Sequence, residues 1–193
     1  VVQFETLTFS QIEEREKVTA ELKKKKAAHH YRQLFSTPLE YEAYKIAHSN
    51  GARGAELAAF LAQCAHESGN YKYTREIHNG SNYEGRKDLG NTMKGFGRLY
   101  RGGGLIQITG RYNYERASYD IYGDARLIEY PELTENSKVA VAVSWWFWEN
   151  RVRPKVKNFS NVYRVTKIIN PALKGFKNRR RLTYNYMRNY NDI

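Results

Sequence analysis

Residues 58–69 read AAFLAQCAHESG, a run of alanine and larger apolar side chains that ends in a carboxylate and a glycine. Alanine has the highest helix propensity, and glycine readily takes the left-handed conformation that ends a helix. These signals predict a helix over residues 56–68. On such a helix Phe60, Cys64 and Glu67 share one stripe, because residues seven apart nearly eclipse. The stripe predicts that Glu67 leans toward apolar packing.

The role of Glu67 depends on its surroundings. A carboxyl group that loses hydration has a raised pKa and can stay protonated near neutral pH, as a general acid requires. The alternative is a solvated glutamate at a frayed helix end. Spacing alone does not choose between these two readings, so the rest of the chain has to decide.

The composition is that of a globular protein with a strongly basic balance. Of its 193 residues, 41% are hydrophobic and 27% charged, and no apolar run approaches the ~20 residues of a membrane span. The formal net charge is +12, with 16 tyrosines and 3 tryptophans. This charge points to nucleic acid, anionic lipid or an acidic cell-wall polymer, and aromatic rings stack on sugars as well as on bases. The first residues show no secretory signal.

Cysteine and histidine usage predicts neither a disulfide nor a metal site. Cys64 is the single cysteine, and its place on the apolar stripe favours core packing over a nucleophilic role. A chain without disulfides suits a reducing compartment of synthesis. The five histidines show no HExxH spacing, so we expect no metal and no cofactor.

Caps, prolines and apolar periodicity predict several more helices. Thr37 is a helix cap followed by Pro38 at the first helical position, with Glu40 closing a capping box. The tryptophans near position 146 lie in a segment that is apolar nearly all round and are expected to pack in the core. The predicted helices, besides the one over residues 56–68, cover residues 10–26, 37–50, 137–148 and 161–169 and a final basic one starting at 175.

Residues 69–104 are predicted to form a long structured loop region. They are rich in glycine, tyrosine and asparagine and keep no period of 3.6 or 2.0 residues, which leaves room for a short β-hairpin. Loops of this length in a compact domain tend to carry function. The carboxylates Glu76, Glu84 and Asp88 are each either a second catalytic group or a loop charge paired with a nearby arginine or lysine.

Residues 101–114 read RGGGLIQITGRYNY. The consecutive glycines permit a close approach of backbones, and the apolar side chains at 105, 106 and 108 predict a buried turn with Gln107 and Thr109 on its other side. A phosphate-binding loop is the rival reading. It is disfavoured because GxxxxGKS/T is absent.

In combination these blocks resemble glycoside hydrolase family 19, and specifically its bacteriophage and bacterial endolysin-like branch. The segment FLAQ running into HESG, at residues 60–69, is similar to the family's catalytic helix. Residues 83–91 and 101–114 resemble its next two blocks, and Asn170 with the Asn178-Arg179 pair its C-terminal cleft residues. The resemblance spans residues 37–190. It departs from the family pattern in two places, where RGRG is replaced by RGGG at 101–104 and NGG by NPA at 170–172.

The resemblance implies a lysozyme-like α+β fold, predominantly helical, in a single catalytic domain of residues 37–193 behind a charged helical arm of residues 1–36. It implies a loop-rich cleft and inverting hydrolysis of β-1,4 bonds between N-acetylated sugars without a metal. Glu67 would be the general acid and Glu76 the base, with Glu84 as the fallback, and Thr109 would help to hold the attacking water. The positions implied to contact substrate are Tyr83, Glu84, Gln107, Tyr112, Asn113, Asn170 and Arg179, of which Arg179 would also hold the acid.

The leading functional hypothesis is a peptidoglycan hydrolase of phage type. A cationic protein without a signal peptide suits synthesis in a host cytoplasm and action on an anionic bacterial wall, reached through a holin or from a virion. We expect a monomer whose partner is peptidoglycan rather than nucleic acid. A chitinase is the alternative within the same enzyme class. A basic nucleic-acid-binding protein or a non-catalytic sugar-binding module would not explain a carboxylate on the stripe of Phe60 and Cys64.

Overall fold

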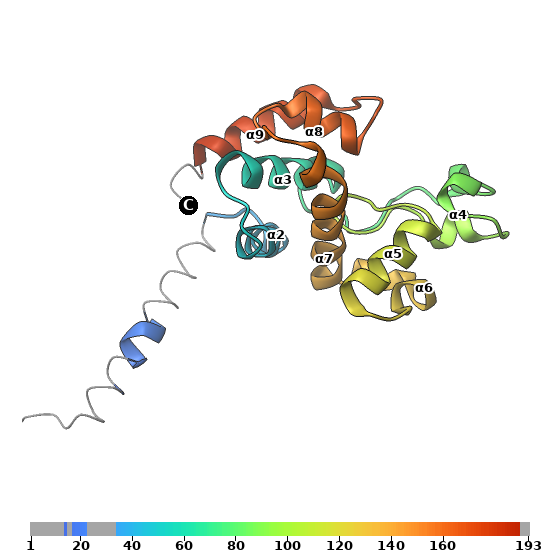
Figure 1. The fold of residues 1–193 in the computed structure, drawn as a ribbon, viewed down its shortest axis with the longest axis horizontal. Helices are drawn as coiled ribbons and strands as arrows, with labels where there is room; N and C mark the ends of the chain where they lie inside the picture. Colours follow the sequence, from blue (N-terminus) through green and yellow to red (C-terminus); the bar gives the residue numbers. More distant parts are fainter. Residues whose placement is uncertain (1–13, 15–16, 23–33, 190–193) are drawn as a thin grey trace, which may run out of the picture.

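The computed structural model describes residues 14, 17–22 and 34–189. Within these residues the chain is almost entirely helical (Figure 1). The α-helices of the described domain are α2 Pro38–Ser49, α3 Gly54–Glu67, α4 Phe96–Leu99, α5 Arg111–Tyr122, α6 Arg126–Glu129, α7 Ser137–Phe147, α8 Val162–Ile169 and α9 Phe176–Asn189. Shorter 3-10 or π turns are η1 Ser81–Tyr83, η2 Lys87–Leu89, η3 Pro131–Glu135, η4 Trp148–Val152 and η5 Arg153–Lys155.

The β-hairpin that the loop region left room for is reduced to isolated bridges. Gly103 pairs with Arg75 and with Ile108, and both bridges are antiparallel. The described residues contain no strand longer than these single bridges. The loop region is instead held by short helical turns and by hydrogen bonds to side chains.

The N-terminal arm is only partly described. Glu14 and residues 17–22 are helical, in agreement with the helix predicted over residues 10–26. Residues 10–13, 15–16 and 23–26 of that predicted helix lie outside the described residues. The division into an arm and a catalytic domain stays a prediction.

The start of α2 follows the predicted cap with one difference. Thr37 Oγ1 accepts a hydrogen bond from the backbone N–H of Glu40 at 3.1 Å, and Pro38 is the first helical residue. The capping box is shifted, because the carboxylate of Glu40 accepts from the backbone N–H of Ser36 at 2.7 Å. Its other oxygen accepts from the Tyr186 hydroxyl on α9. Glu40 therefore caps α2 and ties it to the C-terminal helix.

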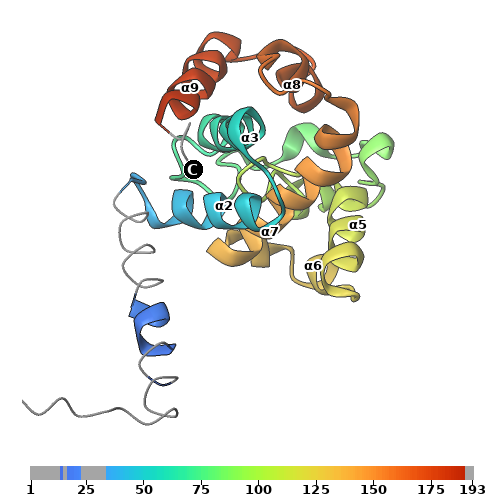
Figure 2. The same cartoon turned by 60° about the vertical axis from the view of Figure 1, so that its left-hand side comes forward.

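Helix α3 lies in the middle of the domain, and its bounds agree with the prediction to within two residues. In both views α9 lies along one side of α3 and α2 on another (Figures 1 and 2). Every residue from Leu57 to Ala65 is buried. Phe60 packs edge-on against Trp145 and Trp148, with ring centroids 5.1 and 5.4 Å apart. This packing fixes the direction in which the last turn of α3 points.

The three tryptophans pack in the core, as predicted. Trp145 and Trp146 are each 4% exposed and Trp148 is 0% exposed. The indole N–H of Trp146 donates to Asp120 at 2.8 Å, and that of Trp148 donates to Glu56 at 3.0 Å. Burial of apolar surface therefore explains these residues, and none of them is available at the surface to stack on a sugar.

The glycines at 102–104 sit where a side chain would collide, which is the close approach that the sequence predicted. A Cβ atom on Gly102 would lie 2.7 Å from Oε1 of Gln107, and one on Gly103 would lie 2.3 Å from the Tyr114 hydroxyl oxygen. The apolar side chains that follow, at 105, 106 and 108, are buried. The turn is thus anchored on its apolar side, and its polar side faces the loop that contains Glu76.

Candidate active site

Glu67 is the last residue of α3, and its carboxylate contacts α9. Oε1 accepts a hydrogen bond from Nη2 of Arg179 at 2.5 Å, and the side chains are 21% and 1% exposed, respectively. Oε2 has no hydrogen-bond partner within the described residues. The expectation that apolar packing surrounds this carboxylate was wrong, because a buried guanidinium lies against it. Arg179 stands where the resemblance placed it, although its role stays a prediction.

The Arg179 guanidinium is held by acceptors from α3 and from the turn before α9. Its Nη1 donates to Oε1 of Gln63 at 2.5 Å, and its Nε donates to the backbone oxygen of Lys174 at 3.0 Å. The amide of Gln63 in turn donates to Thr166 on α8 at 3.3 Å. A buried charge is tolerated only when it is paired and hydrogen-bonded. This network therefore fixes Glu67 at a defined place in the fold.

His66 packs the beginning of α9 against the end of α3. Its Nδ1 lies 2.9 Å from Nδ2 of Asn178, and since an amide nitrogen only donates, this ring nitrogen accepts. Burial and the positive charge of Arg179 lower the pKa of His66, and the charge of Glu67 opposes them. A Cβ atom on Gly175 would lie 2.1 Å from the His66 ring. The His66–Asn178 contact and the small size of Gly175 let the start of α9 lie close to the end of α3, and this places Arg179 next to the Glu67 carboxylate.

Glu76 lies on the loop after α3, and both its carboxylate oxygens accept hydrogen bonds. Oε1 accepts from the Tyr83 hydroxyl and Oε2 from the backbone N–H of Gly102, each at 3.0 Å. The backbone N–H of Glu76 also donates to the Gly102 oxygen at 2.9 Å. A carboxylate oxygen has two lone pairs. Glu76 is therefore held firmly and can still accept a proton from a water molecule.

The hydroxyl of Tyr83 lies within electrostatic reach of both carboxylates. Burial is the largest cause that raises its pKa to about 12, followed by the charge of Glu76 and the hydrogen bond to it. The charge of Arg86 opposes this shift and that of Glu67 adds to it. Tyr83 is thus bonded to Glu76, and the charge of Glu67 is the smallest of the influences on it. The assignment of Glu67 as acid and Glu76 as base stays a prediction.

The fallback base, Glu84, has a structural role in this fold. One carboxylate oxygen accepts from the backbone N–H of Gly95 at 2.5 Å, and the other from that of Gly97 at 2.9 Å. These groups begin α4, where a negative charge is favourable. Asp88 forms an exposed ion pair with Arg86 at 2.5 Å. Glu84 is therefore engaged by the start of α4 and Asp88 by Arg86, and the choice of Glu76 as the base stays a prediction.

The predicted cleft residues on the turn after the glycines are connected to one another. Thr109 Oγ1 donates to the backbone oxygen of Gln107 at 3.0 Å, and Asn113 donates to that of Thr109 at 2.7 Å. Gln107 has a φ of 64° and donates to the Gly104 oxygen at 2.6 Å. A non-glycine residue held in the left-handed region is often found at functional sites. Tyr112 is 55% exposed and thus available for a ligand.

Within the described residues, Asn170 forms no hydrogen bond with another predicted cleft residue. It is the C-terminal cap of α8, and its side-chain oxygen accepts from the backbone N–H of Lys174 at 3.4 Å. It therefore shapes the turn that leads into α9. Its assignment to the substrate site rests on the resemblance alone.

A comparison with protein families identifies the chain. The family model described as chitinase class I matches residues 9–184. The chain belongs to glycoside hydrolase family 19. The match begins inside the segment of residues 1–36 that the resemblance had left out.

Relatives of the family 19 chain come from bacteria and plants. A protein of Haemophilus influenzae, described as containing a glycosyl hydrolase family 19 domain, is 30% identical over 158 residues, which cover 66% of this chain and 76% of that protein. An endochitinase of Arabidopsis thaliana is 37% identical over 99 residues, which cover 51% of this chain. That alignment covers only 34% of the plant enzyme, so the chain spans about a third of its length.

Solved structures confirm the predicted fold class. The family 19, class IV chitinase of Zea mays superposes with a TM-score of 0.59 at 24% identity, covering 81% of this chain and 80% of that one. Chitinase C of Streptomyces griseus gives a TM-score of 0.55 at 21% identity, covering 81% and 76%. At these identities the likeness concerns the fold alone.

Sequence reasoning missed several groups that build this family 19 site. The N–H of Gly102 that holds Glu76 is a backbone group and leaves no signal in the sequence beyond the glycine itself. Asn91 received no role of its own from the sequence, yet it is fully buried. Its side chain donates to the backbone oxygen of Tyr83 at 2.9 Å and accepts from the backbone N–H of Arg111 at 3.1 Å. It thereby ties the loop to the start of α5.

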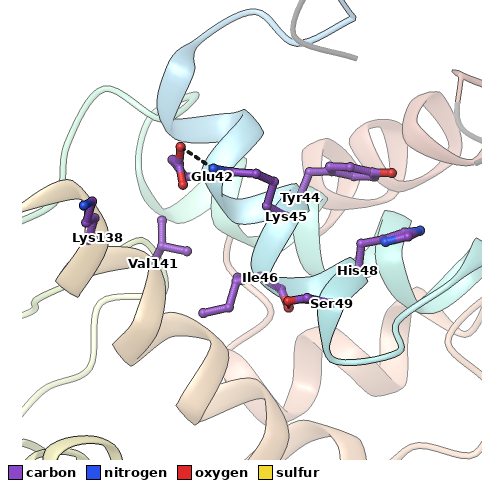
Figure 3. A pocket seen from close by; sticks show the side chains of 8 residues that line it. All are labelled: Glu42, Tyr44, Lys45, Ile46, His48, Ser49, Lys138 and Val141. Atoms are coloured by element: carbon purple, nitrogen blue, oxygen red, sulfur yellow. Dashed lines mark hydrogen bonds and ion pairs between the residues drawn. The ribbon is translucent and has the colours of Figure 1, made fainter. Parts of the chain in front are cut away.

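A hollow lies between α2 and α7 (Figure 3). It has a volume of 470 Å³, and Ile46, Lys138 and Val141 are among its lining residues. The ion pair between Lys45 and Glu42, at 2.8 Å, stands at its edge. None of the predicted cleft residues lines it.

Among the residues that the structure describes, no helix is long and apolar enough to cross a bilayer.

We expect Tyr83→Phe to lower kcat roughly ten- to hundredfold with little change in KM, since a hydrogen bond to a charged group contributes about 1.5 to 3 kcal/mol. The ring keeps its packing, but Glu76 loses one of its two donors. Steady-state kinetics on a soluble oligosaccharide would measure the effect. Tyr119→Phe, at an exposed tyrosine, is the matched control. A rate for Tyr83→Phe within twofold of wild type would show that the hydroxyl does not position Glu76.

Proposed function

We propose that this family 19 protein hydrolyses β-1,4 bonds between N-acetylated sugars with inversion at the anomeric carbon. The observation that supports this most strongly is Tyr83, which donates to Glu76 and whose pKa is raised first by burial and then by the charges of Glu76 and, least, Glu67. Inverting glycosidases need two carboxyl groups about 6.5 to 9.5 Å apart, one protonated and one ionised. That Glu67 and Glu76 lie at such a separation is part of the proposal.

In the proposed reaction the two carboxyl groups act on opposite faces of the sugar. Glu67 donates a proton from Oε2 to the glycosidic oxygen, and the bond from that oxygen to the anomeric carbon breaks. Glu76 takes a proton from a water molecule whose oxygen attacks the same carbon from the other face, assisted by Thr109. Glu67 ends as a carboxylate beside Arg179, and Glu76 ends protonated. Exchange of protons with solvent restores both groups.

We propose peptidoglycan as the substrate, with action at the bacterial cell wall after synthesis in the host cytoplasm or delivery on a virion. The support is the formal net charge of +12, which favours an anionic polymer over a neutral one. Chitin is the second candidate, and a specific observation favours it, since several relatives are named endochitinases. Both substrates have the same type of linkage, so the catalytic groups do not discriminate between them.

A parallel assay separates the candidates. The protein is added to bacteria stripped of their outer membrane, with turbidity as the readout, and to chitin oligomers, with reducing ends as the readout. A DNA mobility shift at several salt concentrations tests the nucleic-acid alternative. We expect the protein to clear the bacterial suspension readily and to hydrolyse the chitin oligomers more slowly. Cleavage of chitin alone would assign a chitinase, and DNA binding without any hydrolysis would overturn the proposal.

Inversion at the anomeric carbon gives a further prediction. Direct attack of water on a β-linked sugar releases the α-anomer first, because no covalent intermediate resets the configuration. Proton NMR of the product, recorded before mutarotation, would show the α signal. A β-anomer as the first product would contradict the mechanism, since it requires a retaining enzyme.

A further inference from the structure

The positive charge of this protein is concentrated at one end of the sequence. Between Asn150 and Asn191 there are twelve arginines and lysines and no aspartate or glutamate. Because the whole chain has a formal net charge of +12, the remaining residues carry equal numbers of acidic and basic side chains. The cationic character therefore belongs to one part of the fold, which includes α8 and α9.

Most cations of this segment have no acidic partner. Arg153 pairs with Glu56 at 2.7 Å, and Arg179 with Glu67 at 2.5 Å. Arg153 also pairs with Glu149, at 3.4 Å. Within the described part of the chain, no other arginine or lysine of residues 150–189 forms an ion pair. Elsewhere in the domain some cations, such as Arg111 and Arg126, are paired, but the acidic residues in the rest of the chain match the basic ones in number. Among the described residues, the cations of α8 and α9 other than Arg179 thus have no acidic partner.

Helix α9 presents this charge on one face. Residues three, four and seven apart lie on the same side of a helix, which groups Lys177, Arg180, Arg181, Tyr184 and Arg188. All of them are exposed. The opposite side of α9 holds Arg179 and Thr183, which are buried against the domain. We call the exposed group the α9 cationic face.

Like charges at this spacing destabilise a helix by about 0.2 to 0.5 kcal/mol per pair. The α9 cationic face therefore opposes the stability of the helix that carries it. The first turns of α9 carry both kinds of residue. Lys177 and Arg180 point to solvent, whereas Arg179 points into the domain and contacts Glu67. In Figures 1 and 2, α8 and α9 form an outer layer over α3. A polymer lying on this layer would be separated from the proposed catalytic acid by α9, about one helix diameter of 10 to 12 Å.

We propose that the α9 cationic face binds the carboxylate groups of the peptide stems of peptidoglycan while the cleft binds a glycan strand. This inference rests on the proposed function and specifies it. Lys177, Arg180 and Arg188 supply the charge, and Tyr184, which is 48% exposed, offers an aromatic ring to an adjacent sugar. Attraction by exposed charges depends on ionic strength, so retention on the wall should weaken as salt rises.

The test is co-sedimentation with purified Gram-negative sacculi, which lack phosphodiester wall polymers. The Glu67→Gln background prevents digestion. In that background, Lys177→Gln, Arg180→Gln and Arg188→Gln are combined, and the matched control combines Lys94→Gln, Arg98→Gln and Lys138→Gln, three exposed cations outside the segment. We expect the α9 variant to bind roughly tenfold more weakly at low salt, since each exposed charge contact adds a small factor, and the control to bind like its parent.

Sacculi whose carboxylates have been coupled to ethanolamine supply the second arm. On these neutralised walls the parent protein should lose its advantage and bind like the α9 variant. Equal binding of the parent to native and neutralised sacculi, or equal binding of the two triple variants, would overturn the proposal. A loss of DNA binding in the α9 variant with unchanged binding to sacculi would also overturn it and would identify nucleic acid as the ligand.

Hydrolysis of a neutral chitin oligomer, measured with Glu67 restored, separates this inference from the proposed function. The α9 variant should hydrolyse the oligomer at the parental rate, which also shows that it folds. If the wild-type protein hydrolyses neither polymer but its binding to sacculi depends on the α9 face, the proposed activity fails and the binding surface stands.

Discussion

Glu67→Gln is expected to lower the rate of hydrolysis by ~10² to 10⁴-fold, because the amide is nearly isosteric with the carboxylic acid but has no proton of suitable acidity to deliver. The structure adds a reason to expect that the variant folds. The amide oxygen of a glutamine at position 67 can accept from Arg179 as Oε1 now does. The guanidinium also keeps Gln63 and the Lys174 oxygen as acceptors.

Glu67→Ala is the informative comparison. It removes the acceptor altogether and leaves the buried Arg179 with one partner fewer, and breaking a buried pair costs about 3 to 5 kcal/mol. Thermal unfolding should therefore separate the two variants, with alanine clearly less stable than glutamine, while both are inactive. Retention of more than a tenth of the wild-type rate by a folded Glu67→Gln would exclude Glu67 as the acid.

The helices could be predicted because their signals are local. Thr37 and Pro38 mark the start of α2, and the alanine-rich run ends α3 within one residue of its predicted end. The turn at 102–104 could be predicted for the same reason, since consecutive glycines indicate that other groups pack closely against the backbone there. Burial of the tryptophans follows from a helix that is apolar nearly all round. None of these features depends on residues far away in the sequence.

The site could be predicted only in part, because its contacts join distant segments. Arg179 lies 112 positions from Glu67 and 116 from Gln63, and no local pattern reports that pairing. Only the resemblance placed Arg179 near the acid, and apolar packing was wrongly expected around Glu67. The position of Glu84 at the start of α4 was likewise hidden, because α4 has only four residues, Phe96–Leu99, too few to give a periodic signal.

Glu76→Gln is expected to reduce kcat strongly, by ~10² to 10⁴-fold, with little change in KM, because a base acts mainly in the transition state. The variant keeps an oxygen that can accept from Tyr83 or from the Gly102 N–H. Loss of activity would therefore reflect the missing base rather than a displaced loop.

Glu84→Gln is the control that makes this assignment decisive. The carboxylate of Glu84 is used by the backbone of α4, so this substitution should lower thermal stability modestly, by about 1 kcal/mol for a weakened cap, and leave most of the activity. A dead Glu84→Gln beside an active Glu76→Gln would transfer the role of base to Glu84 and would mean that α4 rearranges when substrate binds.

Azide distinguishes a missing base from a damaged site. In Glu76→Ala the space vacated by the side chain lies beside Gly102, whose N–H then has no carboxylate to bind, and a small anion can enter and attack the anomeric carbon without a general base. Azide should therefore partly restore the cleavage rate of Glu76→Ala and yield an α-glycosyl azide if attack comes from the face opposite the leaving group. It should not restore Glu67→Gln, because proton delivery to the leaving oxygen is still missing. Rescue of Glu67→Gln together with no rescue of Glu76→Ala would reverse the two roles, since the residue replaced by an anionic nucleophile is the one that activates water.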